Sequence, residues 1–295
     1  MPRNEIVAHL IIGRRREPYL AAVLESIADA CAVAVINDNG GSIPGANDDF
    51  LQSSRLGKDG RLIVVRTSFD GFASARNACI DATPPELRDA WMLFVDADEV
   101  HGDELGAMAR LLPTLPTDIE AVDGYSRHFV GSFSWWVSVE RRLCFFRGRA
   151  DRRWAGRVHE QLEPLGKRAI LPFVWAHYGH VVTPRMEWEK SRLYSSLGQP
   201  GFAPTDEELA GVDAAQAWGR FRPDVMRFEG EHPRAVRLTI ESLNRDWAST
   251  FAAVDAMFSQ VTPLERFRRG VRRANYARLL ALRKLEAGAR WGRIA

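Results

Sequence analysis

The 295-residue sequence lacks any apolar run that approaches the ~18 residues needed to cross a lipid bilayer. Its first residues, Met1 to Glu5, also lack the charged and apolar pattern of a secretory leader. These two absences favour a protein that is made and kept in the cytosol.

Cysteine is also scarce. Cys31, Cys79 and Cys144 are odd in number, far apart in the chain and without the CxxC spacing of redox or metal-binding motifs. This pattern argues against a disulfide framework and against a structural zinc site. We expect buried free thiols instead.

The net charge of +2 conceals an uneven distribution. Residues 264–295 hold ten Arg or Lys and two Glu, a local charge of +8, which leaves −6 for the remainder. The basic tail mixes its charges with Leu, Phe, Tyr and Trp, so a helix there could lie among anionic lipid headgroups on the inner face of the membrane. The alternative is a basic helix that packs on the acidic body. No nucleic-acid partner is expected.

Apolar residues make up 46% of the chain, which is enough for one large core. Strands are predicted at Ile6–Ile12, Cys31–Ile36, Arg61–Arg66 and Trp91–Val95, and helices at Pro18–Ala30, at Phe72–Ala82 and near residues 105–112. This order predicts an α/β fold with a mostly parallel central sheet covered by helices. Three loops at one sheet edge would carry Arg14, Asp38 and Asp96.

The composition changes after Pro184, where a second segment begins. We predict a first domain over 1–184, a helical appendage over 185–262 and a basic amphipathic tail over 263–295. Within the appendage a helix is expected at Met186–Leu197 with Glu187, Lys190 and Arg192 outward, and Thr205 looks like the start of another helix.

The strand Trp91–Val95 stops at an acidic cluster, Asp96, Asp98 and Glu99. If the backbone stays extended through Ala97, Asp96 and Asp98 point to the same side. Carboxylates that close raise each other's pKa unless a cation lies between them. Mg²⁺ or Mn²⁺, completed by a diphosphate, is the simplest partner. In the alternative, Asp98 caps a helix that starts near Asp103.

Residues 123–146 are rich in aromatic side chains, which could line a sugar-binding cleft or form core. Trp135 and Trp136 are the best cleft candidates because adjacent strand positions face opposite ways. Farther on, His159, Glu160, His177 and His180 are of the kinds used for proton transfer and metal ligation. They matter for catalysis only if the fold brings them to the acidic edge.

With these motifs in order, the chain resembles the family-two glycosyltransferases of GT-A fold, and among them the bacterial branch related to lipopolysaccharide-core glucosyltransferases. The resemblance covers roughly residues 6–195. Its pieces are Leu24–Ile27, Asp38, Gly71–Asn77, Asp96–Asp98, Arg142–Arg147 and Gly156–Glu160.

The resemblance implies an inverting enzyme that moves a sugar from a nucleoside diphosphate sugar, with UDP as the expected carrier, to a glycan or lipid-linked acceptor. It implies Mg²⁺ or Mn²⁺, held by Asp98, Asp96 and, as our own addition, His177. Asp38, Arg76 and Asp96 would contact the nucleotide together with Arg14, and the general base would be Glu160 or His159.

Two other functions stay open at this point. One is a catalytically silent module that binds a nucleotide or glycan at the membrane. The other is a metal-dependent nucleotidyltransferase, which would need a glycine-rich phosphate loop with a lysine after the first strand. Gly13-Arg14-Arg15-Arg16 has one glycine and no lysine, so this function ranks last.

Overall fold

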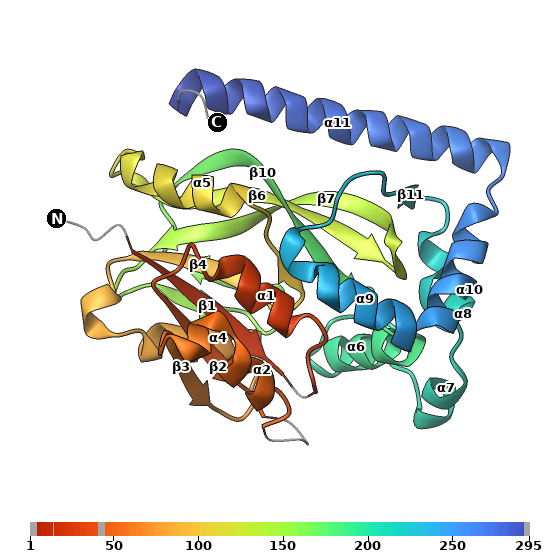
Figure 1. Ribbon diagram of the computed structural model, residues 1–295, viewed down its shortest axis with the longest axis horizontal. Coiled ribbons are helices and arrows are strands. Elements are labelled where there is room, and N and C mark those ends of the chain that lie inside the picture. Colours follow the sequence, from red (N-terminus) through yellow and green to blue (C-terminus); the bar gives the residue numbers. More distant parts are fainter. Residues whose placement is uncertain (1–4, 14, 41–44, 292–295) are drawn as a thin grey trace.

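One mixed sheet organises the molecule (Figure 1). The computed structural model describes residues 5–13, 15–40 and 45–291, with side chains up to residue 287. In the described chain the sheet has nine strands, in the order β3-β2-β1-β4-β7-β6-β10-β5, with β11 beside β7. They are β1 (Ile6–Ile12), β2 (Val33–Asp38), β3 (Leu62–Arg66), β4 (Trp91–Asp96), β5 (Glu99–Val100), β6 (Ile119–Val130), β7 (Ser132–Arg147), β10 (Lys167–His180) and β11 (Met226–Arg227). A separate hairpin joins β8 (Arg153–Ala155) and β9 (Gln161–Glu163).

Strands β3, β2, β1 and β4 run parallel, so their carboxyl ends share one edge. The α/β fold with helices on a largely parallel sheet is confirmed. The second half of the sheet adds antiparallel neighbours, because β7 pairs antiparallel with β4 and with β6, and β10 then runs parallel to β6. The carboxyl edge of β1, β2 and β4 is the edge where open α/β sheets bind ligands.

Helices cover both faces of the sheet. They are α1 (Leu20–Ile27), α2 (Asp48–Ser53), α3 (Arg55–Lys58), α4 (Phe72–Ala82), α5 (Glu104–Leu111), α6 (Pro184–Ser196), α7 (Asp206–Gly211), α8 (Ala214–Trp218), α9 (Arg237–Asp246), α10 (Ala248–Ser259) and α11 (Pro263–Trp291). The predicted helix at Phe72–Ala82 agrees with α4 at both ends. The predicted helices near residues 18–30 and 105–112 correspond to α1 and α5.

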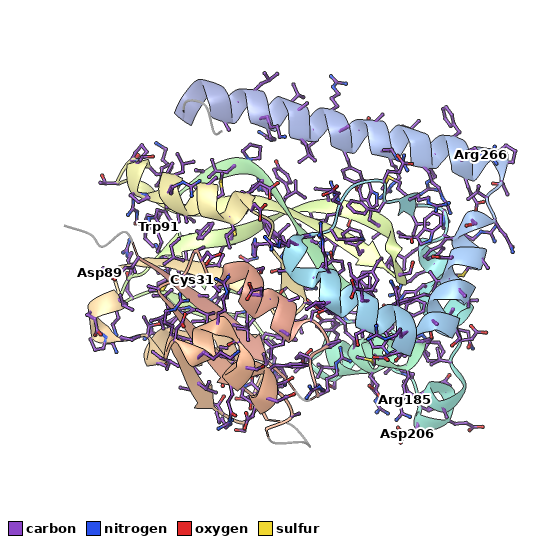
Figure 2. The ribbon with its side chains drawn as sticks, viewed as in Figure 1. Cys31, Asp89, Trp91, Arg185, Asp206 and Arg266 are labelled. Carbon is purple, nitrogen blue, oxygen red and sulfur yellow. The ribbon has the colours of Figure 1, made fainter. Side chains whose placement is uncertain are left out.

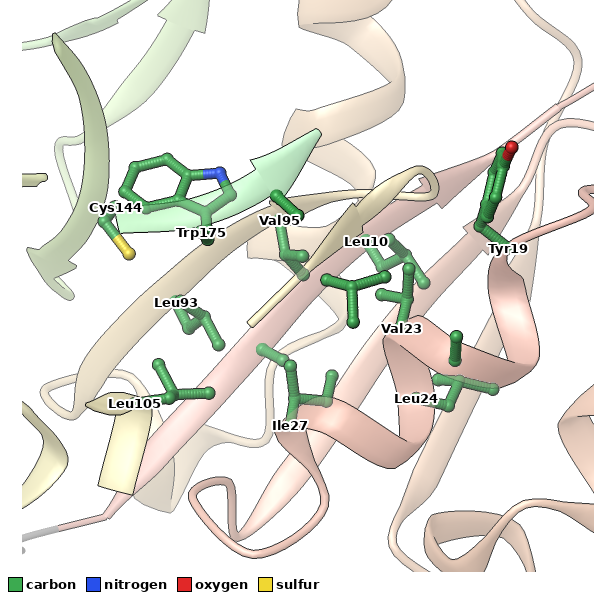
Figure 3. Packing of buried hydrophobic residues seen from close by; sticks show 14 of the residues in the cluster. Leu10, Tyr19, Val23, Leu24, Ile27, Leu93, Val95, Leu105, Cys144 and Trp175 are labelled. Carbon is green, nitrogen blue, oxygen red and sulfur yellow. The ribbon is translucent and has the colours of Figure 1, made fainter. Parts of the chain in front are cut away.

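The strand period decides which helix each apolar residue meets. Leu10, Leu93 and Val95 pack with α1 and α5 on one face, as Figure 3 shows for Leu10, Val23, Ile27 and Leu105. Residues one position along, such as Val7, Met92 and Phe94, pack on the other face with Cys79 of α4. Both faces of β1 and β4 are therefore buried, which explains why these strands read as continuous apolar runs.

The segment after residue 184 is helical, as predicted, but it is built into the same molecule. Thr205 caps α7 with a reciprocal capping box to Glu208, which confirms the predicted helix start. Trp218 and Phe258 share a buried cluster with Trp135 of the sheet, and β11 lengthens the sheet beside β7. The division at residues 184 and 262 stays a prediction.

The basic tail forms α11, which lies along one side of the molecule (Figure 1). Figure 2 places Arg266 near its beginning, at the opposite edge from Arg185 and Asp206. Tyr276, Leu279 and Leu280 pack against the main core. The expectation of a basic helix packed on the body is therefore met by one face of α11. None of the helices in the described part combines the length and apolar character needed to cross a bilayer.

The cysteines and the paired tryptophans are core residues. Cys31, Cys79 and Cys144 are buried and free, as expected. Trp135 and Trp136 are 5% and 7% exposed, and they pack on Phe258 and Tyr276. Trp135 also borders a pocket beside α11 that is lined by arginines. The helices that follow the sheet cover both indoles, so Trp136 is a core residue and Trp135 reaches only the pocket beside α11. A sugar-binding role for Trp135 stays a prediction.

Candidate active site

The acidic cluster lies where β4 ends. The strand stops at Asp96. Ala97 and Asp98 then form a turn, and β5 begins at Glu99. The expected extension through Ala97 does not occur. Asp96 and Asp98 consequently take different partners instead of standing side by side along a strand.

Asp96 is held between two arginines. It follows Met92 and Phe94 on the α4 face of β4, where Arg76 of α4 reaches it. Arg76 Nη2 donates to Oδ1 at 2.7 Å and Arg142 Nη2 to Oδ2 at 3.2 Å. Burial alone would raise the pKa of Asp96, but the two guanidinium groups outweigh it and lower that pKa. Asp96 is therefore an ionised anchor for two cations.

Arg76 also joins Asp96 to Glu160. The Arg76 side chain is buried, its guanidinium lies 4.1 Å from the centre of the Phe94 ring, and its Nε donates to Glu160 Oε1. Glu160 comes from the loop between β8 and β9, and its side chain is only 10% exposed. His159, by contrast, is exposed and has a positive φ of 55°. Of the two predicted base residues, the fold brings Glu160 into contact with the buried arginine.

Asp98 faces His177 across the pairing of β5 with β10. His177 lies opposite Glu99 in that pairing, and its Nε2 is 3.2 Å from Asp98 Oδ1. A Cβ on Gly179 would come within 2.7 Å of Asp98 Oδ2, so only glycine leaves room there. Helix α5 begins at Glu104, after Asp103, and the prediction that Asp98 caps a helix is therefore wrong.

Charge explains the state of Asp98. Burial would raise its pKa, but His177, with Lys190 and Arg142 behind it, holds that pKa well below the usual range. Even so, Asp98 Oδ1 is buried and receives no well-aligned hydrogen bond from the described residues, although His177 Nε2 lies 3.2 Å away. An oxygen with these properties is suited to receive a cation.

Glu99 forms an inner support that the sequence did not reveal. It is buried, and its carboxylate accepts from Trp175 Nε1 at 2.8 Å and from the Asp96 backbone N–H at 3.1 Å. Arg142 Nη1 lies 3.5 Å from the same carboxylate. Arg142 therefore connects Glu99 with Asp96 and stiffens the end of β4. The place of Arg142 in the Arg142–Arg147 motif was the signal that could have identified Arg142 from the sequence.

Asp38 ends β2, on the other side of β1. The register pairs Asp38 with Ile12 and Asp96 with Ile11, so the two aspartates are two strands, or about 10 Å, apart. Asp38 is buried, and its Oδ1 accepts from the Gly40 N–H at 3.0 Å. Arg14, the other predicted nucleotide contact, lies outside the described residues.

Helix α6 adds a cation that was predicted to point outward. Lys190 is partly buried and its Nζ lies 3.5 Å from the Gly179 carbonyl oxygen. Burial would lower the pKa of Lys190, but Tyr194, Asp98 and Glu187 outweigh it, so the pKa is raised and the charge persists. Glu187 is also buried, where it contacts His180 and Arg220. Helical spacing alone could not show that the face of α6 with Glu187 and Lys190 packs against the acidic edge. Arg192 is exposed, as predicted.

These residues form one polar site at the carboxyl edge of the sheet. In the described chain no three His, Cys, Asp or Glu side chains are already gathered closely enough to hold a metal ion. Asp98 and His177 nevertheless form a pair, and a diphosphate could supply further oxygen ligands. The donor set fits a hard divalent ion whose coordination is completed by substrate.

The fold and site define a GT-A glycosyltransferase. The model of the family described as "Glycosyl transferase family 2" matches residues 10–171, just over half of the chain, and the chain belongs to that family. Family membership favours glycosyl transfer over a silent binding module or a nucleotidyltransferase. GT-A enzymes of this family generally use a nucleotide sugar as donor and a divalent metal.

Similarity to solved structures is remote. A crystal structure of S. aureus TarS, residues 1–349, has 13% identity and a TM-score of 0.41, with 98% of this chain and 92% of that chain covered. A putative glucose-1-phosphate thymidylyltransferase from Bacillus anthracis, in complex with sucrose, has 12% identity and a TM-score of 0.32, with 48% and 69% covered. A mannose-6-phosphate isomerase from Helicobacter pylori has 10% identity and a TM-score of 0.31, with 50% and 62% covered. No curated protein matches the sequence.

Proposed function

We propose that this glycosyltransferase is a metal-dependent, inverting enzyme that uses a nucleoside diphosphate sugar, with UDP as the expected carrier. One observation carries the proposal: a buried oxygen of Asp98 receives no well-aligned hydrogen bond from the described residues and lies 3.2 Å from His177 Nε2, at the sheet edge that also holds Asp96. An anionic donor would bring a cation to that oxygen and would be met by the cations around it.

The chain supplies separate groups for the two ends of the donor. Asp38, at the end of β2, would accept hydrogen bonds from the base or ribose. Asp98 and His177 would hold Mg²⁺ or Mn²⁺, and Asp96 would anchor the arginines beside it. When bound, the ion supplies Lewis-acid stabilisation of the leaving diphosphate.

Fixed cations complete the stabilisation of the leaving group. Lys190 and Arg142 carry positive charge at the rim of the site, where Lys190 Nζ donates to the Gly179 carbonyl and Arg142 is paired with Asp96. Because these groups are partly buried, they need little reorganisation as negative charge develops on the diphosphate. Helix α6 would also exclude water, since its Tyr194 packs on Phe72 at the start of α4.

Glu160 is the proposed general base. A single displacement requires a carboxylate within ~3 Å of the acceptor hydroxyl, on the face opposite the leaving diphosphate. Glu160 accepts one hydrogen bond from Arg76 through Oε1, which orients the carboxylate. Its other oxygen would take the proton as the hydroxyl attacks, which inverts the anomeric carbon.

A thermal-shift panel tests the donor and the ion together. UDP, GDP, dTDP and CDP are compared with and without Mn²⁺, because a ligand at 100 times its dissociation constant stabilises by about 2.7 kcal/mol. We expect the largest shift with UDP and Mn²⁺ together. The Asp98→Asn variant should lose the Mn²⁺-dependent part and all turnover. Equal shifts with and without Mn²⁺ would contradict metal dependence.

The outward face of α11 suggests where the enzyme works. Its large apolar side chains Leu264, Phe267 and Leu285 are 75%, 70% and 72% exposed. Arg278 and Lys284 are exposed on the same helix. Apolar side chains interleaved with basic ones suit an anionic lipid surface. We propose peripheral attachment to the inner face of the membrane, where a glycan or lipid-linked acceptor would be reached.

Vesicle flotation tests this attachment. Full-length protein should float with phosphatidylglycerol vesicles and not with phosphatidylcholine vesicles. A double variant, Phe267→Ser with Leu285→Ser, should float poorly while keeping its thermal stability. Equal flotation of both proteins would count against α11 as the membrane contact.

A further inference from the structure

Behind His177 lies a second buried histidine that the proposed mechanism does not use. His128 of β6 faces His177 of β10, since the two residues are paired in the register of these strands. Their Nδ1 atoms are 2.8 Å apart, and both side chains are largely buried. On the far side, His128 Nε2 is 3.6 Å from Glu140 Oε2, and Glu140 is exposed.

Two facing nitrogens at hydrogen-bond distance share one hydrogen. If both carried a hydrogen the hydrogens would collide, and if neither did the lone pairs would repel. For a pair of neutral rings this leaves two arrangements. Either His128 donates to His177, or His177 donates to His128. The hydrogen positions on the outer nitrogens follow from that choice.

The two arrangements present different atoms to Asp98. When His128 donates, His177 keeps its hydrogen on Nε2 and points it at the Asp98 carboxylate. When His177 donates from Nδ1, its Nε2 lone pair lies beside the Asp98 oxygen at 3.2 Å. That second arrangement is unfavourable by itself, because a lone pair then faces an anion, and it becomes favourable when a cation binds both atoms. His128 then carries its hydrogen on Nε2, toward Glu140.

We propose that His128 is a positioning residue that sets the tautomer of His177 for cation binding. This inference rests on the proposed function, since it assumes an ion at Asp98 and His177. His128 accepts the Nδ1 hydrogen of His177, which frees Nε2 as a ligand and fixes the ring plane. With both rings neutral, the pair holds two hydrogens in either arrangement, so exchange between the two arrangements requires no net proton uptake or loss.

Metal-ligating histidines usually donate their second N–H to a fixed acceptor, and loss of that acceptor typically weakens metal binding 10- to 100-fold. Here the acceptor is an imidazole instead of a carboxylate. A buried carboxylate in that place would add a further negative charge next to Asp98 and Glu99. An imidazole accepts the hydrogen without adding charge to the site.

The first test is nitrogen NMR on ¹⁵N-histidine-labelled, full-length protein. A coupling across the Nδ1–H···Nδ1 hydrogen bond identifies the pair among the seven histidines without any substitution. With Mg²⁺ and UDP we expect the shared hydrogen to lie on His177 Nδ1, and we expect His177 Nε2 to carry no hydrogen. A shared hydrogen that stays on His128 after Mg²⁺ and UDP are added would overturn the proposal.

The second test is Mn²⁺ affinity, measured by electron paramagnetic resonance with UDP present. His128→Phe keeps the bulk but cannot accept a hydrogen bond, so Mn²⁺ should bind about 10- to 100-fold more weakly. His128→Gln offers a carbonyl acceptor and should restore part of the affinity. The matched control, His101→Phe, replaces another buried histidine, whose ring centre lies 5.4 Å from that of Trp175, and it should leave the affinity unchanged.

The outcomes separate the two proposals. If the wild-type protein binds no Mn²⁺, the metal-dependent function fails and the role of His128 fails with it. If the wild type binds Mn²⁺ and His128→Phe binds it equally well, only the role of His128 is wrong.

Discussion

At the scale of single residues, the carboxylates at the acidic edge differ in the side chains that contact each of them. Asp96 is paired with two arginines, Asp98 faces His177, and Glu160 is paired with Arg76. Three carboxylates that look alike in the sequence thus have three different surroundings, which suit them to the three different roles proposed above. Among the described residues, the neighbours of each carboxylate determine which of its oxygens already accept hydrogen bonds.

Replacement of Glu160 tests the base. Glu160→Gln keeps the size and can still accept a hydrogen bond from Arg76, but it cannot take a proton. We expect donor binding in the thermal-shift assay to persist while kcat falls by roughly 10²-fold or more. His159→Gln serves as the control and should keep most of its turnover. A Glu160→Gln enzyme with the parent rate would remove Glu160 from the mechanism.

His9 predicts how stability depends on pH. Its Nε2 donates to Thr83 Oγ1, which itself donates to the Cys79 carbonyl, and its Nδ1 is buried with no partner among the described residues. Burial, assisted by Arg76, lowers the pKa of His9 to about 3 from 6.5. Between about pH 3 and pH 6.5, His9 therefore carries a proton in the unfolded chain but not in the folded chain. The stabilisation is therefore complete above pH 6.5 and is lost as pH falls.

Urea unfolding at pH 7 and pH 5 measures this contribution. The His9 proton alone should lower the free energy of unfolding by about 2 kcal/mol at pH 5. His9→Gln has no ionisable ring and should lose correspondingly less over the same interval. Other buried histidines act in both proteins and cancel in the comparison. Parallel pH profiles for the two proteins would contradict the prediction.

At the scale of elements, the hairpin that carries Glu160 depends on α4. Asn77 of α4 donates to the Trp154 carbonyl and accepts from the Trp154 N–H, both at 2.9 Å. A Cβ on Gly71, at the N-terminal cap of α4, would lie 3.8 Å from the Arg157 carbonyl oxygen. The helix that supplies Arg76 therefore also fixes the loop that supplies Glu160.

Asn77→Ala should uncouple that loop. It leaves two partly buried backbone groups of Trp154 without partners, so we expect a loss of about 1–3 kcal/mol in the free energy of unfolding and a fall in kcat. Asp81→Ala is the matched control. It removes an exposed ion pair between Asp81 and Arg153 that joins the same two elements, and such pairs contribute about 0–1 kcal/mol. Equal effects from the two changes would argue against a positioning role for Asn77.

At the scale of the whole molecule, α11 is part of the folded body as well as a surface. Tyr276, Leu279 and Leu280 pack against the main core, and Arg272 Nη2 donates to the Val137 carbonyl at 3.0 Å. Arg272, on this side of the helix, therefore links α11 to β7. Arg278 and Lys284 are exposed on the same helix and are the basic residues proposed to meet a membrane.

Truncation after Val261 should therefore destabilise the enzyme. The loss of three packed side chains predicts a fall in the free energy of unfolding on the order of 3 kcal/mol or more, measured by urea titration. The Phe267→Ser and Leu285→Ser variant should stay within about 0.5 kcal/mol of the parent, because both side chains are exposed. A truncated protein as stable as the parent would show that α11 is an independent appendage.

The amino-acid sequence by itself determined the order of elements and the identity of the acidic edge. Apolar runs ended by polar residues located β1, β2, β3 and β4, and local spacing located α4 and the start of α7. These features depend on neighbours within about ten residues, which periodicity and capping describe. Asp38, Asp96, Asp98 and Glu160 were predicted as site residues from local motifs, and the resemblance supplied the roles proposed for them.

Only the tertiary structure decided which side chains contact one another at this edge. It ended β4 at Asp96, turned Lys190 inward, buried the paired tryptophans and set His128 behind His177. Each of these depends on contacts between segments far apart in the chain. Strand register and helix packing create such contacts, and no local pattern encodes which distant partner a side chain will meet.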